Sequence, residues 1–468
     1  MNFTEYNFLI FFLVVFISYW LLKRRQWQNL LLLVASYGLY GWAHPWYAIM
    51  LGLSTLADYA LALGIVQNRA RTKWFMTASL LVNVGVLAFF KYYNFFSGGL
   101  VNALSGLGLQ ADPLLVKIIL PMGLSFFSLK KLAYVIDVAR GTLEPTRDLA
   151  GFALFVSFFP QVNSGPIDRA QKLLPQIQSD RVWKPENFYS AWPLIVMGFF
   201  KKVVIANTVI VAVDRVFSLR QPTIVLILMA ALGFTLQILA DFSAYTDISR
   251  GVARLFGFET TENFNNPYLS LTPTDFWNRW HITLSTWLRD YIFFPLRRAL
   301  LRSKVKFPSW LVDAVPPLVT MLVSGIWHGA QLNYPVWGLY FGVLIVGYQA
   351  FGLGGNWKPP HWWTRLLAWL VMFIFIVVGW LIFRVPSLDW LFTMLRSSPF
   401  LGSPEEANMA FVTLFVVAIY AAPLIIKLLV DRFWKQDSLV HAAYYVMATL
   451  LMIVYLNSGS PDFIYYRY

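Results

Sequence analysis

The sequence predicts an all-α protein that crosses a membrane many times, and three observations lead to this fold class. Of its 468 residues, 58% are hydrophobic and only 13% are charged, whereas soluble domains average about 25% charged residues. Aromatic residues reach 18%, with 20 Trp and 23 Tyr, which is typical of proteins with aromatic belts at both membrane interfaces. The apolar residues also gather in long runs. Lipid is therefore the expected solvent for most of the chain.

The first apolar run, residues 7–22, predicts where the N-terminus lies. Three basic residues follow it at 23–25, whereas a cleavable signal peptide carries its charges before the apolar run. We therefore expect a retained span with its N-terminus in the periplasm. Runs at 28–43 and 46–66 come next, followed by three more basic residues within 69–73. Two spans separate the basic clusters, which places both on the cytoplasmic side, where Lys and Arg accumulate.

Ten further apolar runs complete the prediction of the spans. A spanning helix needs about 20 residues, so we expect on the order of 11 to 13 membrane segments, some of them broken or re-entrant. Charged residues interrupt several runs, at 130–131, 201–202, Asp241 and Asp247, and such groups normally face protein or a water-filled cavity. The ten runs lie at 74–92, 114–127, 149–160, 188–217, 222–240, 311–327, 335–351, 364–383, 408–430 and 440–456.

The segment 259–310 differs from the rest because it is too polar to span a membrane. It is rich in Asn, Pro, Trp and Arg, and between Arg289 and Lys306 it holds six basic residues against one acid, Asp290. We expect amphipathic helices that lie at or dip into the cytoplasmic interface. No linker or tandem repeat suggests a further domain, so residues 1–468 are expected to form a single transmembrane domain.

Composition also excludes several kinds of chemistry. The chain has no cysteine, so disulfides, thiolate nucleophiles and thiolate metal sites are excluded. The sequence contains no Gly-x-Ser-x-Gly elbow, no phosphate-binding P-loop and no histidine pair at helical spacing for a di-iron centre. We expect no metal and no permanently bound cofactor. The net charge of +14 fits cytoplasmic loops beside spans better than nucleic-acid binding, and could also hold an acidic ligand at the cytoplasmic side.

The five histidines divide into two groups. His44, His361 and His441 lie in turns or at the start of a run, where capping or interfacial contacts are the expected role. His281 and His328 each follow a Trp directly. Imidazole can take up and return a proton near neutral pH, and apolar surroundings hold it neutral. His281 and His328 are therefore candidate general bases.

Two glycines accompany His328, at 325 and 329. Without side chains there, a substrate or a second helix can approach the imidazole closely. The alternative is that both glycines serve helix packing around a histidine that is satisfied inside the bundle. The pattern leaves both interpretations open.

Four ordered motifs resemble the signature series of the membrane-bound O-acyltransferase family: Asp241–Asp247, Glu262–Ser270, Phe276–Ile292 and Ser324–Ala330. Within the family, the chain resembles the bacterial branch that includes the alginate O-acetyltransferase membrane component and the D-alanine exporter of teichoic acid modification. Further matches extend the resemblance over nearly the whole chain, at 121–127, 134–138, 158–161, 165–167, 198–203 and 463–466. The chain departs from the branch at 128–130, Asn207 and 297–298.

The resemblance implies a ring of tilted helices around a thin centre, with cytoplasmic and periplasmic funnels joined by a tunnel. His328 matches the family's key histidine, and His281 matches the second catalytic position. An acyl thioester, acetyl-CoA or an acyl carrier, would enter from the cytoplasm, and an acceptor hydroxyl would reach His328 from the other side. The residues expected to bind the donor are Trp280, Arg279, Ser285, Arg289, Trp327 and Asp241.

The implied function is a membrane O-acetyltransferase that moves acetyl groups across the bacterial inner membrane for an exported polysaccharide of the alginate or cellulose type. Implied partners are a periplasmic SGNH-type acetyltransferase and a polysaccharide synthase or export complex. Two alternatives are a transporter for polysaccharide or lipid-linked sugar and a scaffold subunit of a synthase complex. Transporters usually contain internal repeats, which this chain lacks, and a pure scaffold would make both Trp-His pairs coincidental.

Overall fold

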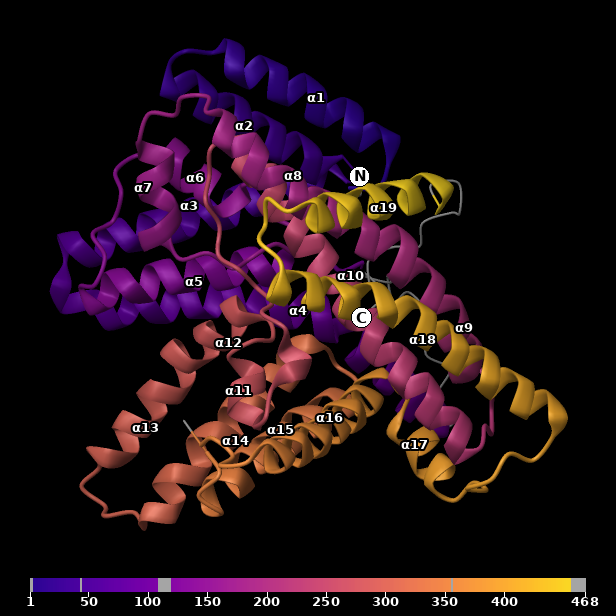
Figure 1. Ribbon diagram of the computed structural model, residues 1–468. Coiled ribbons are helices and arrows are strands. Elements are labelled where there is room, and N and C mark those ends of the chain that lie inside the picture. The colour runs from indigo at the N-terminus through magenta and orange to yellow at the C-terminus, as the bar shows by residue number, and fades with distance from the viewer. Residues whose placement is uncertain (1–2, 43, 108–118, 355–356, 456–468) are drawn as a thin grey trace. The chain divides into compact units, whose positions relative to one another are not determined.

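The computed structural model describes residues 3–42, 44–107, 119–354 and 357–455 (Figure 1). These residues form helices joined by loops and turns, and no strand occurs among them. The terminal motif at 463–466 and the start of the run at 114–127 lie outside the described residues. The helices are α1 Tyr6–Leu21, α2 Arg25–Gly41, α3 Pro45–Gln67, η1 Arg69–Arg71, α4 Thr72–Gly106, α5 Leu124–Arg140, α6 Leu149–Ser157, α7 Ala170–Gln178, α8 Pro185–Phe199, η2 Phe200–Ala206, α9 Asn207–Phe217, α10 Ile224–Leu255, η3 Pro267–Leu269, α11 Pro273–Trp277, α12 Ile282–Leu288, η4 Arg289–Phe293, α13 Phe294–Leu301, α14 Ser309–His328, α15 Asn333–Ala350, α16 Trp362–Arg384, α17 Leu388–Leu395, α18 Pro404–Phe433 and α19 Leu439–Tyr455.

The predicted class, an all-α protein that crosses the membrane several times, is confirmed. Within the described ranges, 7 helical segments are long and apolar enough to cross a membrane, and α1 and α19 are shorter apolar helices. Other predicted segments form helices that are shorter or more polar, such as α5 and α15. The ring of helices and the tunnel stay predictions. The seven segments are Pro45–Gln67, Arg69–Gly106, Pro185–Phe217, Ile224–Leu255, Ser309–His328, Trp362–Arg384 and Pro404–Phe433.

The chain contacts group into two compact units. The first comprises residues 1–191 and 249–261, and the second comprises 192–248 and 262–468. Helices α8 and α10 each contribute residues to both units. The expected single domain stays a prediction, and each unit is described by itself.

Charges inside the first unit are paired, as expected for groups in a membrane. Asp58 on α3 accepts hydrogen bonds from Ser79 Oγ at 2.5 Å and Asn83 Nδ2 at 2.7 Å, both on α4. The Lys131 ammonium on α5 lies 3.5 Å from the same carboxylate. Its neighbour Lys130 donates to Gln161 Oε1 at 3.1 Å. These contacts replace the water that a buried charge loses.

Two further ion pairs connect η2 with α10 in the second unit. Lys201 Nζ lies 2.5 Å from Asp247 Oδ2, and Lys202 Nζ lies 2.8 Å from Asp241 Oδ1. η2 is a π-helical turn between α8 and α9. A π turn holds more residues than an α-helical turn, so adjacent side chains point in more similar directions. The turn therefore lets two consecutive lysines both reach α10.

Helices α14 and α15 pack closely because glycines remove the side chains at their contact. A Cβ added at Gly325 would lie 2.2 Å from the Tyr334 carbonyl oxygen, and one at Gly338 would lie 2.2 Å from the Met321 carbonyl oxygen. Both distances are far below van der Waals contact, so only glycine fits at these two positions. This pair of helices carries His328 at its end.

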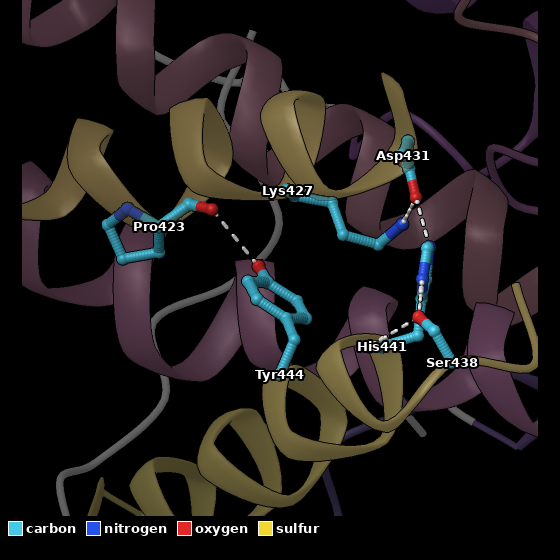
Figure 2. A network of polar contacts seen from close by, with 6 residues as sticks. All are labelled: Pro423, Lys427, Asp431, Ser438, His441 and Tyr444. Atoms are coloured by element: carbon cyan, nitrogen blue, oxygen red, sulfur yellow. Dashed lines mark hydrogen bonds and ion pairs between the residues drawn. The ribbon is translucent and has the colours of Figure 1, made fainter. Parts of the chain in front are cut away.

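Helices α18 and α19 are joined by a polar cluster around His441 (Figure 2). His441 Nε2 lies 3.0 Å from Asp431 Oδ1, and its Nδ1 lies 3.2 Å from Ser438 Oγ. The Lys427 ammonium also contacts the Asp431 carboxylate, and the Tyr444 hydroxyl donates to the Pro423 carbonyl at 3.1 Å. These contacts fit the structural role expected for His441.

Candidate active site

His328 is the last residue of α14, and aromatic rings surround it. Its ring lies 5.1 Å from Trp337, at 90°, and 5.1 Å from Phe383, at 87°. The Tyr334 ring is 6.4 Å away. The side chain is half-buried, and the next residue, Gly329, is fully extended and ends the helix. The aromatic rings fix the position of the imidazole and leave part of it accessible.

The glycines beside His328 serve the packing of the two helices. The space above Gly325 is filled by the Tyr334 backbone, and a Cβ at Gly329 would lie 2.6 Å from the Tyr334 ring. The element that approaches the glycines closely is therefore helix α15. Of the two interpretations left open by the sequence, this contact favours helix packing. The glycines bring Tyr334 against α14 and so define one side of the His328 environment.

His281 occupies a strained backbone position immediately before α12. Its φ of 41° and ψ of 54° lie in the left-handed region, which is costly for a residue with a side chain and is typical of functional sites. The side chain is 1% exposed, and its Nδ1 lies 3.1 Å from Asn263 Oδ1. The ring also packs edge-on against Phe242, with centroids 4.8 Å apart.

Burial lowers the pKa of the His281 imidazole to about 3, because the protonated ring would lose its hydration. His281 lies in the segment 259–310, outside the spanning helices. At neutral pH the ring is therefore uncharged. A neutral imidazole is the form that can accept a proton or a hydrogen bond.

This pKa predicts an acid-sensitive contribution to stability. The unfolded chain binds a proton at His281 below about pH 6.5, whereas the folded chain resists protonation until about pH 3. Stability from this residue is therefore present above pH 6.5 and is lost as the pH falls through that window. The Tm of the His281→Gln variant in lipid nanodiscs should fall less between pH 7 and pH 4.5 than that of the wild type. Parallel curves would contradict the assignment.

Trp327 contacts both histidines. Its ring lies 6.4 Å from His281 and 4.9 Å from His328. The two histidines come from different elements, the residue before α12 and the end of α14. The fold therefore brings the two predicted catalytic residues next to the same side chain, the predicted Trp327.

A pocket of about 190 Å³ lies beside this site. Its wall residue Trp277 contacts Trp337 at 5.7 Å, and Trp337 in turn contacts His328. The indole nitrogens of Trp277 and Trp337 are buried and have no hydrogen-bond partner within the described part of the chain. Buried donors of this kind favour a substrate that offers an oxygen acceptor. The pocket is lined by Thr274, Trp277, Asn278, Ser285, Thr286, Leu288, Arg289, Phe293, Pro317, Thr320, Met321, Ile345 and Gln349.

The residues expected to bind the donor separate into four groups. Ser285 and Arg289 line the pocket, and Trp327 lies next to both histidines. Trp280 is buried in an aromatic cluster, 4.6 Å from Trp380. The last two are held in ion pairs, Arg279 with Asp275 at 2.7 Å and Asp241 with Lys202 at 2.8 Å.

Several residues of the site were not singled out from the sequence. Asn263 lies inside the motif 262–270, yet its contact with His281 depends on the left-handed backbone at His281. Trp337 and Phe383 belong to apolar runs that look like ordinary spans. Their signal in the sequence is weak because aromatic residues are frequent throughout this chain.

The remaining histidines have structural contacts. His361 caps α16 through reciprocal hydrogen bonds with Thr364. His44 precedes α3 and lies 5.0 Å from the Tyr47 ring. Together with His441 in the α18–α19 cluster, they lie in the capping or terminal positions expected from the sequence.

Comparison of the sequence with known proteins identifies the family of the chain. The model of the membrane-bound O-acyltransferase family matches residues 145–388, a range that contains both His281 and His328. The probable alginate O-acetylase of Pseudomonas aeruginosa is 35% identical over 419 residues, covering 88% of this chain and 78% of the relative. The chain belongs to the membrane-bound O-acyltransferase family.

Two other relatives show how broad the family's acceptors are. The peptidoglycan O-acetyltransferase of Helicobacter pylori is 31% identical over 419 residues, covering 82% of this chain and 76% of the relative. The teichoic acid D-alanyltransferase of Bacillus subtilis is 30% identical over 274 residues, covering 56% of this chain and 68% of the relative. This chain is therefore a membrane O-acyltransferase that crosses the membrane several times, and it is similar to proteins named for alginate, peptidoglycan and teichoic acid.

Proposed function

We propose that this enzyme transfers acetyl groups from cytoplasmic acetyl-CoA to an acceptor hydroxyl, for O-acetylation of an exported polysaccharide of the alginate or cellulose type. The observation that carries the proposal is the position of His281 and His328 against one indole ring, Trp327, near a pocket that Arg289 helps to line. The protein would lie in the inner membrane with its N-terminus in the periplasm. A periplasmic SGNH-type acetyltransferase and a polysaccharide synthase or export complex would act with it.

The chemistry follows from the groups that line the site. His328 takes the proton of the acceptor hydroxyl as its oxygen attacks the thioester carbonyl. The tetrahedral intermediate then expels the coenzyme A thiolate, which takes up the proton, so that an ester and a thiol are formed. Trp277 lines the pocket and its buried indole N–H has no hydrogen-bond partner in the described residues, so it is a candidate donor to the acyl oxygen, where negative charge develops. The half-exposed Arg289 guanidinium pairs with Asp290 at 3.1 Å, and in this proposal it also attracts the phosphates of the donor.

A binding experiment tests the donor assignment. The Arg289→Gln variant should bind radiolabelled acetyl-CoA about tenfold more weakly than the wild type, since it loses one charge-assisted contact at the pocket. Binding would be measured with the purified protein in lipid nanodiscs. The matched control is Arg297→Gln, which removes the same charge from a residue that pairs with Asp313 and does not line the pocket. Equal weakening in both variants would argue against the pocket, and no binding by the wild type would exclude acetyl-CoA as the free donor.

A further inference from the structure

The amide of Asn263 has a fixed orientation, and this follows from its neighbour Thr283. Asn263 Oδ1 lies 3.2 Å from the Thr283 backbone nitrogen and 2.9 Å from Thr283 Oγ1. A backbone N–H can only donate a hydrogen bond, so the atom that faces it must be the amide oxygen. Asn263 and Thr283 are 1% and 3% exposed, so bulk water is excluded from this contact.

The same oxygen faces Nδ1 of His281, at 3.1 Å. Because an amide oxygen only accepts, Nδ1 must carry the hydrogen in this contact. The neutral ring has a single N–H, and its lone pair therefore lies on Nε2. Asn263 thereby selects one of the two imidazole tautomers.

Backbone contacts hold the two partners in register. The Asn263 carbonyl accepts from the Ile282 N–H at 3.0 Å, and the Asn265 N–H donates to the Arg279 carbonyl at 3.0 Å. These bonds flank His281, whose left-handed backbone would otherwise be unfavourable. The segment before η3 and the start of α12 are thus joined around the imidazole.

We propose that Asn263 is a positioning residue that holds His281 as the Nδ1–H tautomer, so that Nε2 receives a proton or hydrogen bond from the substrates and does not donate one to the acyl oxygen. This inference rests on the proposed function and adds to it that His281 contacts a substrate. It decides between two roles for that histidine, because a ring with its hydrogen on Nδ1 cannot stabilise negative charge through Nε2.

The tautomer can be measured without any activity assay. The protein would be labelled with nitrogen-15 histidine in nanodiscs, and the His281 signals assigned by their loss in His281→Gln. We expect a protonated Nδ1 and an unprotonated Nε2 in the wild type, and a loss of this pattern in Asn263→Leu. Asn265→Leu is the matched control, because Asn265 is exposed and only two residues away. A protonated Nε2 in the wild type would overturn the inference.

Activity separates a positioning role from a structural one. Asn263→Leu should lower the rate of acetyl transfer roughly 10- to 100-fold, as expected when the partner of an essential imidazole is removed, while Asn265→Leu keeps the wild-type rate. Asn263→Asp retains an oxygen acceptor and adds a negative charge, which raises the pKa of His281. Acetyl transfer by Asn263→Asp should therefore recover at alkaline pH, where His281 is neutral. As the pH is lowered, its rate should begin to fall at a higher pH than the rate of the wild type.

Different results would contradict the role of His281 and the role of Asn263. If the measured tautomer is as expected but His281→Gln keeps full acetyl transfer, the proposed contact of His281 with substrate is overturned. If His281→Gln is inactive and Asn263→Leu keeps both the rate and the tautomer, Asn263 is not a positioning residue. A lower Tm in Asn263→Leu without recovery in Asn263→Asp would show a purely structural role.

Discussion

Replacing His328 by alanine is expected to reduce acetyl transfer to the polysaccharide at least 100-fold. General base catalysis contributes about 10²–10⁴-fold, and in the proposed mechanism His328 takes the hydroxyl proton. The ring is half-buried and lies at a helix end, so its removal should leave insertion and folding intact. The ester content of exopolysaccharide would be measured in cells that express the variant. The amount of the variant protein in the membrane would be measured in the same cells.

The matched control for this experiment is His44→Ala. His44 is an exposed histidine before α3, distant in the chain from the proposed site, and its replacement should leave acetylation unchanged. Normal acetylation by His328→Ala would remove this residue from the catalytic mechanism. Loss in both variants would point to expression or insertion as the cause.

A large loss of stability is expected when one partner of the Lys202–Asp241 pair is removed. Their side chains are 2% and 4% exposed, and an uncompensated charge left behind in such a place costs about 3–5 kcal/mol. The Lys202→Met and Asp241→Leu variants should therefore unfold at clearly lower temperatures than the wild type. The double variant removes both charges and should recover most of the loss, because paired apolar replacements are often close to neutral.

Thermal unfolding in nanodiscs, followed by circular dichroism, would compare the three variants. The expected result is strong coupling, with the double variant far more stable than the sum of the single effects predicts. Additive losses would show that the contact contributes little. The more exposed Lys201–Asp247 pair, at 11% and 19%, is the internal comparison and should lose less when Lys201 is replaced by Met.

Hydrophobic runs predicted most of the helices because each span needs about 20 apolar residues, whatever its partners are. The predicted run at 364–383 appears as α16, Trp362–Arg384, and the run at 46–66 as α3. The π turn η2 was not predictable in the same way. It coincides with the pairing of Lys201 and Lys202 with α10, a tertiary contact that the hydrophobic pattern does not reveal.

For the site, residue chemistry was more informative than position in a motif. His281 and His328 were predicted from the behaviour of imidazole in apolar surroundings, and the fold brings both against Trp327. Arg279 was expected to bind the donor on the strength of the family resemblance, yet its partner Asp275 lies four residues earlier, a spacing that already favours a local ion pair on a helix. Asn263 required the fold, since 18 residues separate it from His281.

The glycine contacts between α14 and α15 bear on how acyl groups of different length are told apart. With Gly325 and Gly338 pressed against opposing carbonyl oxygens, neither helix can slide along the other without a backbone collision. The pocket residues Thr320 and Met321 on α14 and Ile345 and Gln349 on α15 therefore keep a fixed position relative to one another. If this pocket receives the acyl group, as in the proposed function, side-chain volume selects the chain length, and we expect acceptance of longer chains to require smaller side chains at these positions.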